Sequence, residues 1–361
     1  MNKHYYAAIL AGGLGTRFWP KSRASFPKQF LDILGTGETL IQSAYKRYAS
    51  FILPENIYII TSTEYVDIIK EQLPAINAEN ILAEPSRKNT APCVAYMAQK
   101  LLQQDAEAAF VVAPSDHVVT DLETFKELSL QGLDFANKTG AFVTLGIKPT
   151  YPNTGYGYIQ YDTTSSKDEI VFKVKTFTEK PDLELAKTFL ASGEFLWNAG
   201  IFMWSAKDVM QAFEKFQPEM FELFVSEKDN FNTAEETQAL ERIYPLCVSI
   251  SIDYAIMEKA NNVFVIPAEF GWSDLGTWNS AYTNLDKDEH GNSVTTENII
   301  TFDSANNMIS APEEKLLVIQ GLEDFIVIDT DDVLLICKKE KEQQVKEFLS
   351  EVKKRKGDKF H

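Results

Sequence analysis

Short apolar runs alternate with amphipathic stretches over most of the chain, which predicts strands separated by helices. The predicted strands are YAAIL, NIYIIT, AAFVVA, AFVTLGI, GIFMWS and VFVIPA. The predicted helices are ETLIQSAYKRYA, TEYVDIIKEQL, APCVAYMAQKLLQQ and DLETFKELSLQGLDFANK, the last with apolar side chains at roughly helical spacing. Apolar strands that alternate with helices indicate an α/β fold with a mostly parallel sheet covered on both faces. In such sheets, ligands bind at the carboxyl ends of the strands.

The pattern changes near residue 285. The stretch TNLDKDEHGNSV is polar and rich in turn residues, and it is followed by the short strand-like runs NIITF, LLVIQG, FIVIDT and VLLICK, with no helix between them. Short runs of this kind suit the coils of a β-solenoid, although the repeat is degenerate. We therefore expect a large α/β domain over 1–285, a short β module over 286–340, and a charged helix and tail over 341–361.

Composition narrows the function. The chain has 361 residues, is 45% hydrophobic and carries a formal net charge of -17, so binding to nucleic acid or to an anionic membrane is not expected. The three cysteines (Cys93, Cys247 and Cys337) are far apart and odd in number, which argues against a disulfide framework or a CxxC metal site. The sequence shows neither a signal peptide nor a transmembrane pattern. We expect a cytoplasmic protein.

Against this acidic background the stretch AILAGGLGTRFWPKSRASFPKQF, residues 8–30, is unusual because it gathers glycines and cations. Glycines directly after a strand allow a sharp turn and point backbone N–H groups at an anion. The loop does not match the GxxxxGK[ST] phosphate loop, and Phe18 stands where the dinucleotide motif needs its third glycine. It therefore predicts a phosphate loop of a third kind, with the cations Arg17, Lys21, Arg23 and Lys28.

The same stretch strongly resembles the signature of the sugar-phosphate nucleotidylyltransferases in their mannose-1-phosphate guanylyltransferase form. The resemblance continues in order through EPSRKNTAP, APSDH, NTGYGYI, FTEKPD, LWNAGIF, SIDYAIMEK and GWSDLGTW. It implies a Rossmann-like nucleotidyltransferase domain, a short left-handed β-helix-like module and a homodimer. It also implies the reaction of GTP with α-D-mannose 1-phosphate, which gives GDP-mannose and pyrophosphate.

That chemistry needs charge neutralisation, because one anion must attack the α-phosphorus of another. Asp116 and Asp274 each follow a predicted strand, and the resemblance assigns both to Mg²⁺ or another divalent cation such as Mn²⁺. An aspartate after a strand also suits a turn or a helix N-cap, so each residue alone would indicate only a local structural role.

The resemblance assigns the other site residues. Arg17, Lys28 and Lys180 are implied as catalytic cations, with Lys180 at the phosphate of the sugar. The nucleotide-binding positions are Leu10, Ala11, Gly12, Gly13, Gly15, Thr16, Arg17, Lys28, Glu84, Asn89, Thr90, Ser115 and Asp116. The sugar-phosphate positions are Gly155, Tyr156, Glu179, Lys180 and Asn198.

Several residues leave questions open. The family commonly has Arg where Lys88 stands and Ala where Cys93 stands. A lysine keeps the charge but not the bidentate geometry of arginine, which puts the role of Lys88 in base or phosphate binding in doubt. Asn89 or Thr90 also suits a helix N-cap. His117 has no supporting metal-ligand spacing and is interpreted as structural, and neither Asp253 nor Glu258 receives a role.

Three alternative functions stay open. The first is the same chemistry with another nucleoside triphosphate or sugar 1-phosphate. The second is a non-catalytic regulatory homologue that binds a nucleotide sugar; the intact cations and aspartates argue against it. The third is a dinucleotide-dependent oxidoreductase, against which Phe18 argues.

Overall fold

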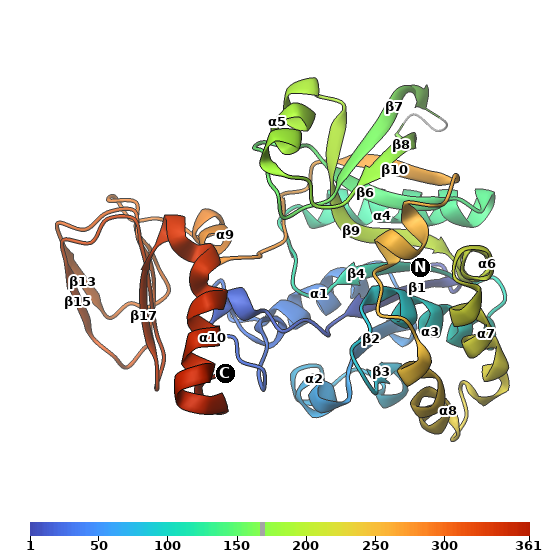
Figure 1. Cartoon of the computed structure of the whole chain (residues 1–361), viewed down its shortest axis with the longest axis horizontal. Coiled ribbons are helices and arrows are strands. Elements are labelled where there is room, and N and C mark those ends of the chain that lie inside the picture. The colour runs from blue at the N-terminus through green and yellow to red at the C-terminus, as the bar shows by residue number, and fades with distance from the viewer. Residues whose placement is uncertain (167–169) are drawn as a thin grey trace. The chain divides into compact units, whose positions relative to one another are not determined.

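The structure is a computed structural model that describes residues 1–166 and 170–361 (Figure 1). The chain forms two compact units that do not follow chain order. The first unit contains residues 1–12, 45–114 and 119–272, and the second contains 13–44, 115–118 and 273–361. The chain passes from one unit to the other inside the glycine loop, inside α1 (Leu40–Ala49), between Pro114 and Ser115, and at the short strands β5 (Val118–Val119) and β11 (Trp272–Ser273).

A nine-stranded sheet in the order β3-β2-β1-β4-β9-β6-β10-β8-β7 is the centre of the first unit. Its strands β3, β2, β1 and β4 are parallel, as are β6 and β10, whereas β9 runs antiparallel to β4 and β6. The α/β prediction is confirmed, and the sheet, expected to be mostly parallel, is mixed. The strands are β1 (Tyr5–Leu10), β2 (Ile57–Ser62), β3 (Ile81–Glu84), β4 (Ala109–Pro114), β6 (Phe142–Ile147), β7 (Tyr158–Ser166), β8 (Phe172–Thr178), β9 (Phe195–Ser205) and β10 (Val263–Ala268).

Helices cover both faces of this sheet, as the continuous apolar runs predict. On β9, Phe202 and Trp204 belong to the core that also holds the buried face of α3, while Met203 between them contacts the opposite side at Gly132 of α4. A Cβ on Gly132 would come within 2.6 Å of the Met203 sulfur, so glycine lets the helix approach closely. The helices are α2 (Val66–Gln72), α3 (Thr90–Leu102), α4 (Leu122–Thr139), α5 (Leu183–Ser192), α6 (Ala206–Phe216), α7 (Pro218–Ser226) and α8 (Glu236–Ile243).

The helix boundaries follow from local chemistry. The Asp121 carboxylate accepts a hydrogen bond from the Thr124 N–H at 3.0 Å and caps α4, which ends at Gly140 with φ 69°. In the same way, Asp182 caps the start of α5, and α5 ends at Gly193. Asn89 caps α3, as its sequence position predicts, and its side chain accepts from the Thr90 N–H at 2.9 Å.

The second unit contains a short solenoid of parallel rungs (Figure 1). Strands β12, β14 and β16 pair in parallel, β13 pairs in parallel with β15, and β17 closes the first of these sheets in the antiparallel direction. The C-terminal β-helix-like module is therefore confirmed. Its elements are α9 (Trp278–Asn284), β12 (Ser293–Val294), β13 (Ile299–Phe302), β14 (Met308–Ser310), β15 (Leu317–Gln320), β16 (Phe325–Asp329), β17 (Leu334–Lys338) and α10 (Val345–Lys356).

Stacked asparagines hold successive coils of the solenoid together. The buried Asn307 amide donates to Asn292 Oδ1 at 2.9 Å and to the Leu322 carbonyl at 2.8 Å, and its own Oδ1 accepts from the Phe325 N–H. Each coil thus satisfies backbone groups of its neighbour that the turns leave unpaired.

A single apolar core ties the solenoid to the glycine-loop segment within the second unit. It packs Phe18 and Trp278, with ring centroids 4.8 Å apart, against side chains of β16 and β17 and against Val345 and Leu349 of α10. The Trp19 indole N–H also donates to the Phe360 carbonyl at 2.7 Å. The C-terminal helix therefore packs against the glycine loop and supports it, and this is the loop that the sequence predicts to bind phosphate.

Two expectations from the sequence concern disulfide bonds and membrane-spanning helices. The three cysteines are free and buried. Over the described ranges, 1–166 and 170–361, no helix combines the length and the apolar character needed to cross a bilayer.

Candidate active site

A polar cavity of about 260 Å³ lies within the second unit. It brings together six residues that the sequence assigned to phosphate or metal, although they are far apart along the chain. Its lining consists of Gly15, Thr16, Arg17, Lys28, Asp116, His117, Asp274, Gly276 and Lys346.

Lys28 is the buried cation of this cavity, with only 7% of its surface exposed. Its ammonium lies 2.9 Å from Asp116 Oδ2 and donates to the Leu275 carbonyl at 2.9 Å and the Asp274 carbonyl at 3.4 Å. Gly15 makes room for this side chain, because a Cβ there would come within 2.6 Å of Lys28 Cγ and the glycine has φ 57°. The glycine therefore positions a lysine in addition to shaping the loop.

The two aspartates enter the cavity from different segments. Burial alone would raise the pKa of the Asp116 carboxyl, but Lys28 and His117 hold that pKa below its usual value, so Asp116 is ionised at neutral pH. Asp274 Oδ1 accepts from the Gly276 N–H at 3.1 Å, and Leu275 beside it has φ 43°. A left-handed leucine is unusual and marks a backbone held in place by its surroundings.

These carboxylates suit a magnesium ion. Hard carboxylate oxygens are the ligands that Mg²⁺ and Mn²⁺ prefer, and Mg²⁺ at nucleotide sites commonly takes one or two carboxylates together with phosphate oxygens and water. Within the part of the chain that the structure describes, no cluster of three or more His, Cys, Asp or Glu side chains forms a candidate metal site. The donor set at Asp116 and Asp274 therefore fits a metal shared with a phosphate ligand, and a closed all-protein cage is absent from the described residues.

The cations of the loop divide into two groups. Arg17 and Lys28 line the cavity, whereas Arg23 forms an ion pair with Asp332 at 2.7 Å and, like Lys21, is not among the lining residues. The Arg17 Nε is buried without a hydrogen-bond partner among the described residues. Lys346, which no sequence motif indicated, also lines the cavity, from α10.

The remaining nucleotide positions of the loop lie on both sides of the unit boundary. Leu10 ends β1, and Ala11 continues its ladder, donating to the Ile60 carbonyl at 2.7 Å. Gly12 belongs to the first unit, while Gly13 and the buried Ser115 belong to the second.

A second cluster, within the first unit, surrounds Glu84 at the end of β3. The Tyr244 hydroxyl donates to Glu84 Oε1 at 2.9 Å, and burial raises the pKa of the carboxyl to about 7. Burial also raises the pKa of Tyr244, Tyr96 and Cys93, the other titratable groups that interact with this carboxyl, well above their usual values. Glu84 is therefore the member of this cluster that titrates near neutral pH.

The segment after Glu84 is fixed at both ends of the turn into α3. Thr90 Oγ1 accepts from the Ile252 N–H at 2.8 Å, and Asn89 takes a left-handed φ of 66° at the cap. The Lys88 ammonium donates to the Pro245 carbonyl at 3.2 Å, directly after Tyr244. In this chain Lys88 thus helps hold the segment that carries the tyrosine partner of Glu84.

A third cluster, also within the first unit, forms around Asn198 on β9. Its side-chain amide nitrogen donates to Asp253 Oδ1 at 2.9 Å, and its side-chain Oδ1 accepts from the Gly200 N–H at 3.0 Å. Burial, followed by the charge of Glu179, raises the pKa of Asp253 to about 6. The structure therefore places Asp253, which had no role from sequence, beside the predicted sugar residues. Burial and the charges of Glu179 and Asp253 likewise raise the pKa of Glu258.

Glu179 and Lys180 lie at the same cluster. Glu179 is only 12% exposed at its side chain, and Gly157 lies against it, since a Cβ there would meet Glu179 Oε2 at 2.5 Å. Lys180 takes a left-handed φ of 46°, and its ammonium donates to Glu179 Oε1 at 2.5 Å. Strain at a non-glycine residue next to buried carboxylates is typical of a functional site.

Gly155 and Tyr156 belong to the loop before β7. The Gly155 N–H donates to Asn153 Oδ1 at 2.6 Å, and the Tyr156 ring contacts Trp197 and Trp272 with centroids 5.1 and 5.3 Å away. Trp197 is buried in the core. The aromatic contacts hold Tyr156 in place near the sugar cluster.

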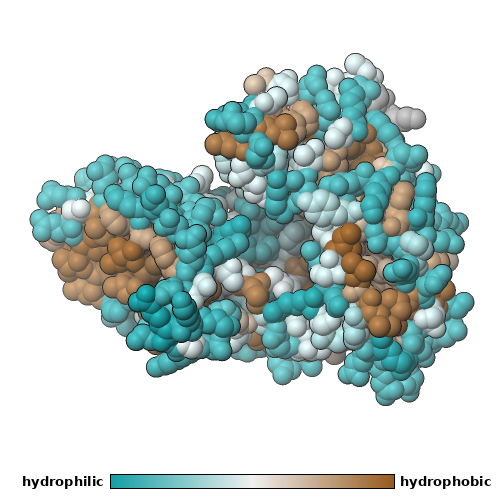
Figure 2. Space-filling model, viewed as in Figure 1, coloured by the Kyte–Doolittle hydropathy of each residue, from teal (hydrophilic) through white to brown (hydrophobic). Residues whose placement is uncertain are grey.

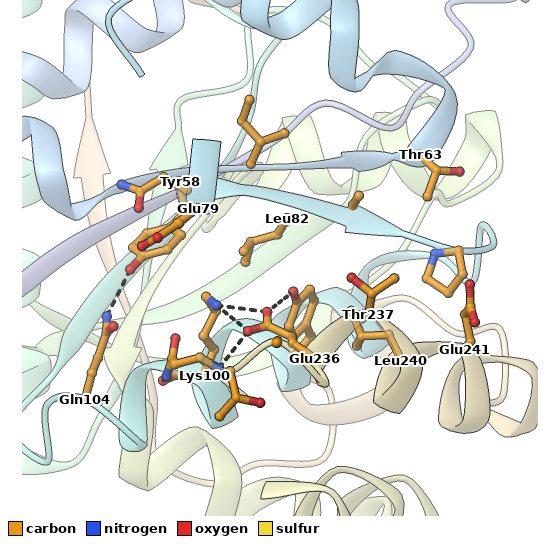
Figure 3. Close-up of a pocket in the computed structure, with 18 residues that line it drawn as sticks. Tyr58, Thr63, Glu79, Leu82, Lys100, Gln104, Glu236, Thr237, Leu240 and Glu241 are labelled. Carbon is orange, nitrogen blue, oxygen red and sulfur yellow. Dashed lines mark hydrogen bonds and ion pairs between the residues drawn. The ribbon is translucent and has the colours of Figure 1, made fainter. Parts of the chain in front are cut away.

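Another cavity, of about 610 Å³, lies in the first unit between β3, α3 and α8 (Figure 3). Figure 3 shows its lysine, Lys100, and Glu236 pointing toward one another, with the ammonium 2.6 Å from Glu236 Oε2. The Tyr96 hydroxyl donates to the same carboxylate. Because its cation is already neutralised, this cavity does not favour a phosphate ligand, in contrast to the cavity at Arg17 and Lys346.

Comparison with known proteins identifies the family. A family model described as nucleotidyl transferase matches residues 6–291, and a model described as MannoseP isomerase/GMP-like beta-helix domain matches residues 297–352. The chain belongs to the nucleotidyl transferase family. It is an enzyme that transfers a nucleotidyl group, and the resemblance found in the sequence motifs is confirmed.

Individual relatives agree with this placement. The chain is 34% identical to a mannose-1-phosphate guanylyltransferase of Escherichia coli over 97% of its own length and 76% of the relative. It is 35% identical to the alginate biosynthesis protein AlgA of Pseudomonas aeruginosa, over 95% of this chain and 71% of that one. A crystal structure from Thermus thermophilus, described as a mannose-1-phosphate geranyltransferase, superposes with a TM-score of 0.86 at 29% identity, covering 97% of this chain and 99% of that one.

Proposed function

We propose that this nucleotidyltransferase transfers GMP from GTP to α-D-mannose 1-phosphate, giving GDP-mannose and pyrophosphate. The observation that carries the proposal is the cavity in which Arg17, Lys28 and two carboxylates from distant segments converge. The name of the E. coli relative supports the choice of guanine and mannose.

The chain's own residues supply binding and charge neutralisation. An oxygen of the sugar phosphate attacks the α-phosphorus, the bond from that phosphorus to the β-phosphate oxygen breaks, and pyrophosphate leaves with the bonding electrons. No general base is required because the attacking oxygen is already ionised. Lys28 and Arg17 stabilise negative charge on the phosphate oxygens, and Asp116 and Asp274 would hold the divalent ion. When bound, Mg²⁺ or Mn²⁺ supplies further charge neutralisation at those oxygens.

One assay tests the specific reaction and its nearest alternative. The purified protein is incubated with Mg²⁺, each of four nucleoside triphosphates and a panel of sugar 1-phosphates, while pyrophosphate release is followed. We expect the highest kcat/KM with GTP and mannose 1-phosphate. Faster pyrophosphate release with another nucleoside triphosphate and sugar 1-phosphate would show that those are the substrates. No release with any combination would support the non-catalytic alternative.

We propose that Glu84 selects the base. A carboxylate accepts the guanine N1–H and 2-amino donors together, while adenine offers no such donor pair. Only the ionised form does this, and the pKa of Glu84 is about 7. A raised acid pKa means that the carboxylate fraction grows as pH rises through 7, so kcat/KM for GTP should increase about tenfold between pH 6 and pH 8.

The pH profiles of variants provide the measurement. Glu84→Gln removes the titrating group, so its kcat/KM for GTP should be low and its profile nearly flat, apart from the ionisation of GTP itself. Tyr244→Phe removes the hydroxyl that donates to the carboxylate, so the rise should shift to higher pH. If kcat/KM for GTP rises with pH as steeply in Glu84→Gln as in the wild type, Glu84 is not the group responsible.

We also propose a homodimer formed through the solenoid. Figure 2 shows apolar residues gathered over the region that Figure 1 labels β13 and β15, and Ile300, Phe302, Leu316 and Val318 are between 48 and 63% exposed. This face offers few charges for an acidic or basic partner, so the same face of a second copy is the best complement. Val318→Glu should yield monomers in light scattering, whereas the charge change Glu314→Lys in the same module should not. A concentration-independent wild-type monomer would contradict the proposal.

A further inference from the structure

The cation Lys346 has no role in the proposed reaction, although it lines the phosphate cavity. It lies on α10, inside the segment that matches the β-helix domain, and far in sequence from the glycine loop. Its position is well defined within the second unit, since its neighbour Val345 and the next-turn Leu349 are buried in the same core as Phe18. The helix therefore brings an exposed lysine to a fixed place beside the loop.

The electrostatics at this place are unfavourable unless an anion is present. The pKa of the Lys346 ammonium lies below its usual value, first because of the positive charge of Arg17 and second because of partial burial. Two like charges held close together destabilise each other. The Arg17 Nε beside it is buried and has no hydrogen-bond partner among the described residues.

The acid that interacts with Arg17 does not remove this excess of positive charge. Glu342 interacts with Arg17, but it is used elsewhere: its Oε2 accepts from the Asn279 N–H at the start of α9, at 2.8 Å. Lys28, the third cation of the cavity, is bound to Asp116 and two carbonyls. Arg17 and Lys346 are thus the cations of this cavity that remain available to a ligand.

We propose that Lys346 and Arg17 together bind the β- and γ-phosphates of the nucleoside triphosphate, and hence the departing pyrophosphate. An arginine offers a planar fork of donors and a lysine a compact point charge, a combination suited to two adjacent phosphates. On this view the C-terminal module completes the active-site cavity in addition to forming the solenoid. The inference deepens the proposed function and rests on it for the identity of the nucleotide.

Binding of inorganic tripolyphosphate, measured by calorimetry with full-length protein, gives a readout that does not depend on turnover. Lys346→Ala should weaken this binding about ten- to a hundredfold, as expected for the loss of one charge-assisted contact. Lys346→Arg should restore most of the affinity. Lys354→Ala, on the same helix but outside the cavity lining, is the matched control and should bind like the wild type. Equal affinity of Lys346→Ala and wild type would overturn the inference.

Kinetics then locate the contact on the substrate. In the forward direction Lys346→Ala should raise KM for GTP and leave KM for the sugar 1-phosphate unchanged. In the reverse direction it should raise KM for pyrophosphate and leave KM for the nucleotide sugar unchanged. A change confined to KM for the sugar substrates would contradict the assignment to the β- and γ-phosphates. Weaker tripolyphosphate binding in a protein with no transferase activity would keep the inference and refute the proposed function.

Discussion

Replacing Asp274 with asparagine is expected to lower kcat by about a hundred- to a thousandfold, a loss typical of removing one electrostatic contact to the transition state. The amide has nearly the size of the carboxylate, and its oxygen can still accept the hydrogen bond from the Gly276 N–H. It is, however, a neutral and much weaker ligand for Mg²⁺ or Mn²⁺. The measurement is pyrophosphate release as a function of metal concentration.

Asp274 is a better choice than Asp116 for this experiment. Asp116 is the carboxylate next to the buried Lys28, so its replacement would leave that ammonium without an anion and destabilise the fold as well. Direct Mn²⁺ binding in the presence of GTP should be lost in Asp274→Asn, while the melting temperature stays close to that of the wild type. Asp288→Asn, which changes an aspartate in a surface turn of the same unit, is the matched control. Activity of Asp274→Asn within a factor of two of wild type would remove the metal assignment.

The elements best predicted from sequence were the strands that are buried on both faces and the helices that cover them. The runs of β1, β2, β4, β6 and β10 are predominantly apolar because both faces of each strand are buried; the exceptions are Thr144 in β6 and Thr61 and Ser62 at the end of β2. The strands β7 and β8 were not predicted. The side chains of β8 are half buried or exposed, and burial in β7 decreases from Tyr158 to Thr164 without alternation. Such a pattern separates poorly from that of a polar loop.

The candidate site divides in the same way. Glycines, strand-end aspartates and the motif residues were found because their local sequence is distinctive. Asp253 was not assigned, since its partner Asn198 lies on a different element and the π-helical turn Asp253–Met257 has no simple periodicity. Lys346 was missed for a related reason: it belongs to a helix rich in lysine, and only packing shows which lysine reaches the cavity.

Unusual backbone occurs in or beside each of the three clusters described above. Left-handed φ values occur there at Asn89, Lys180 and Leu275, and outside these clusters at Asn232, Asp303, Asn306 and Asp324. A residue with a side chain adopts this conformation at a cost of about 1–3 kcal/mol, so the surrounding structure must enforce it. The sequence alone marks none of these positions as strained, because glycine is the residue from which a left-handed conformation is normally predicted.

Replacing Lys180 with methionine is expected to lower kcat/KM for mannose 1-phosphate by about ten- to a hundredfold, which corresponds to the loss of one hydrogen bond between charged groups. The side chain is 61% exposed and bonds only to the adjacent Glu179 in the described structure, so the fold should tolerate methionine. The effect should fall on KM for the sugar 1-phosphate and leave KM for GTP nearly unchanged, because a point charge at the sugar phosphate does not contact the base or the polyphosphate. Lys180→Arg should recover part of the activity, and Lys187→Met, an exposed lysine of α5 paired with Glu184, should behave like the wild type. An increase of KM for GTP as large as that for the sugar phosphate would show instead that Lys180 acts on the nucleotide, and the division of roles between the cavity cations and Lys180 would then be wrong.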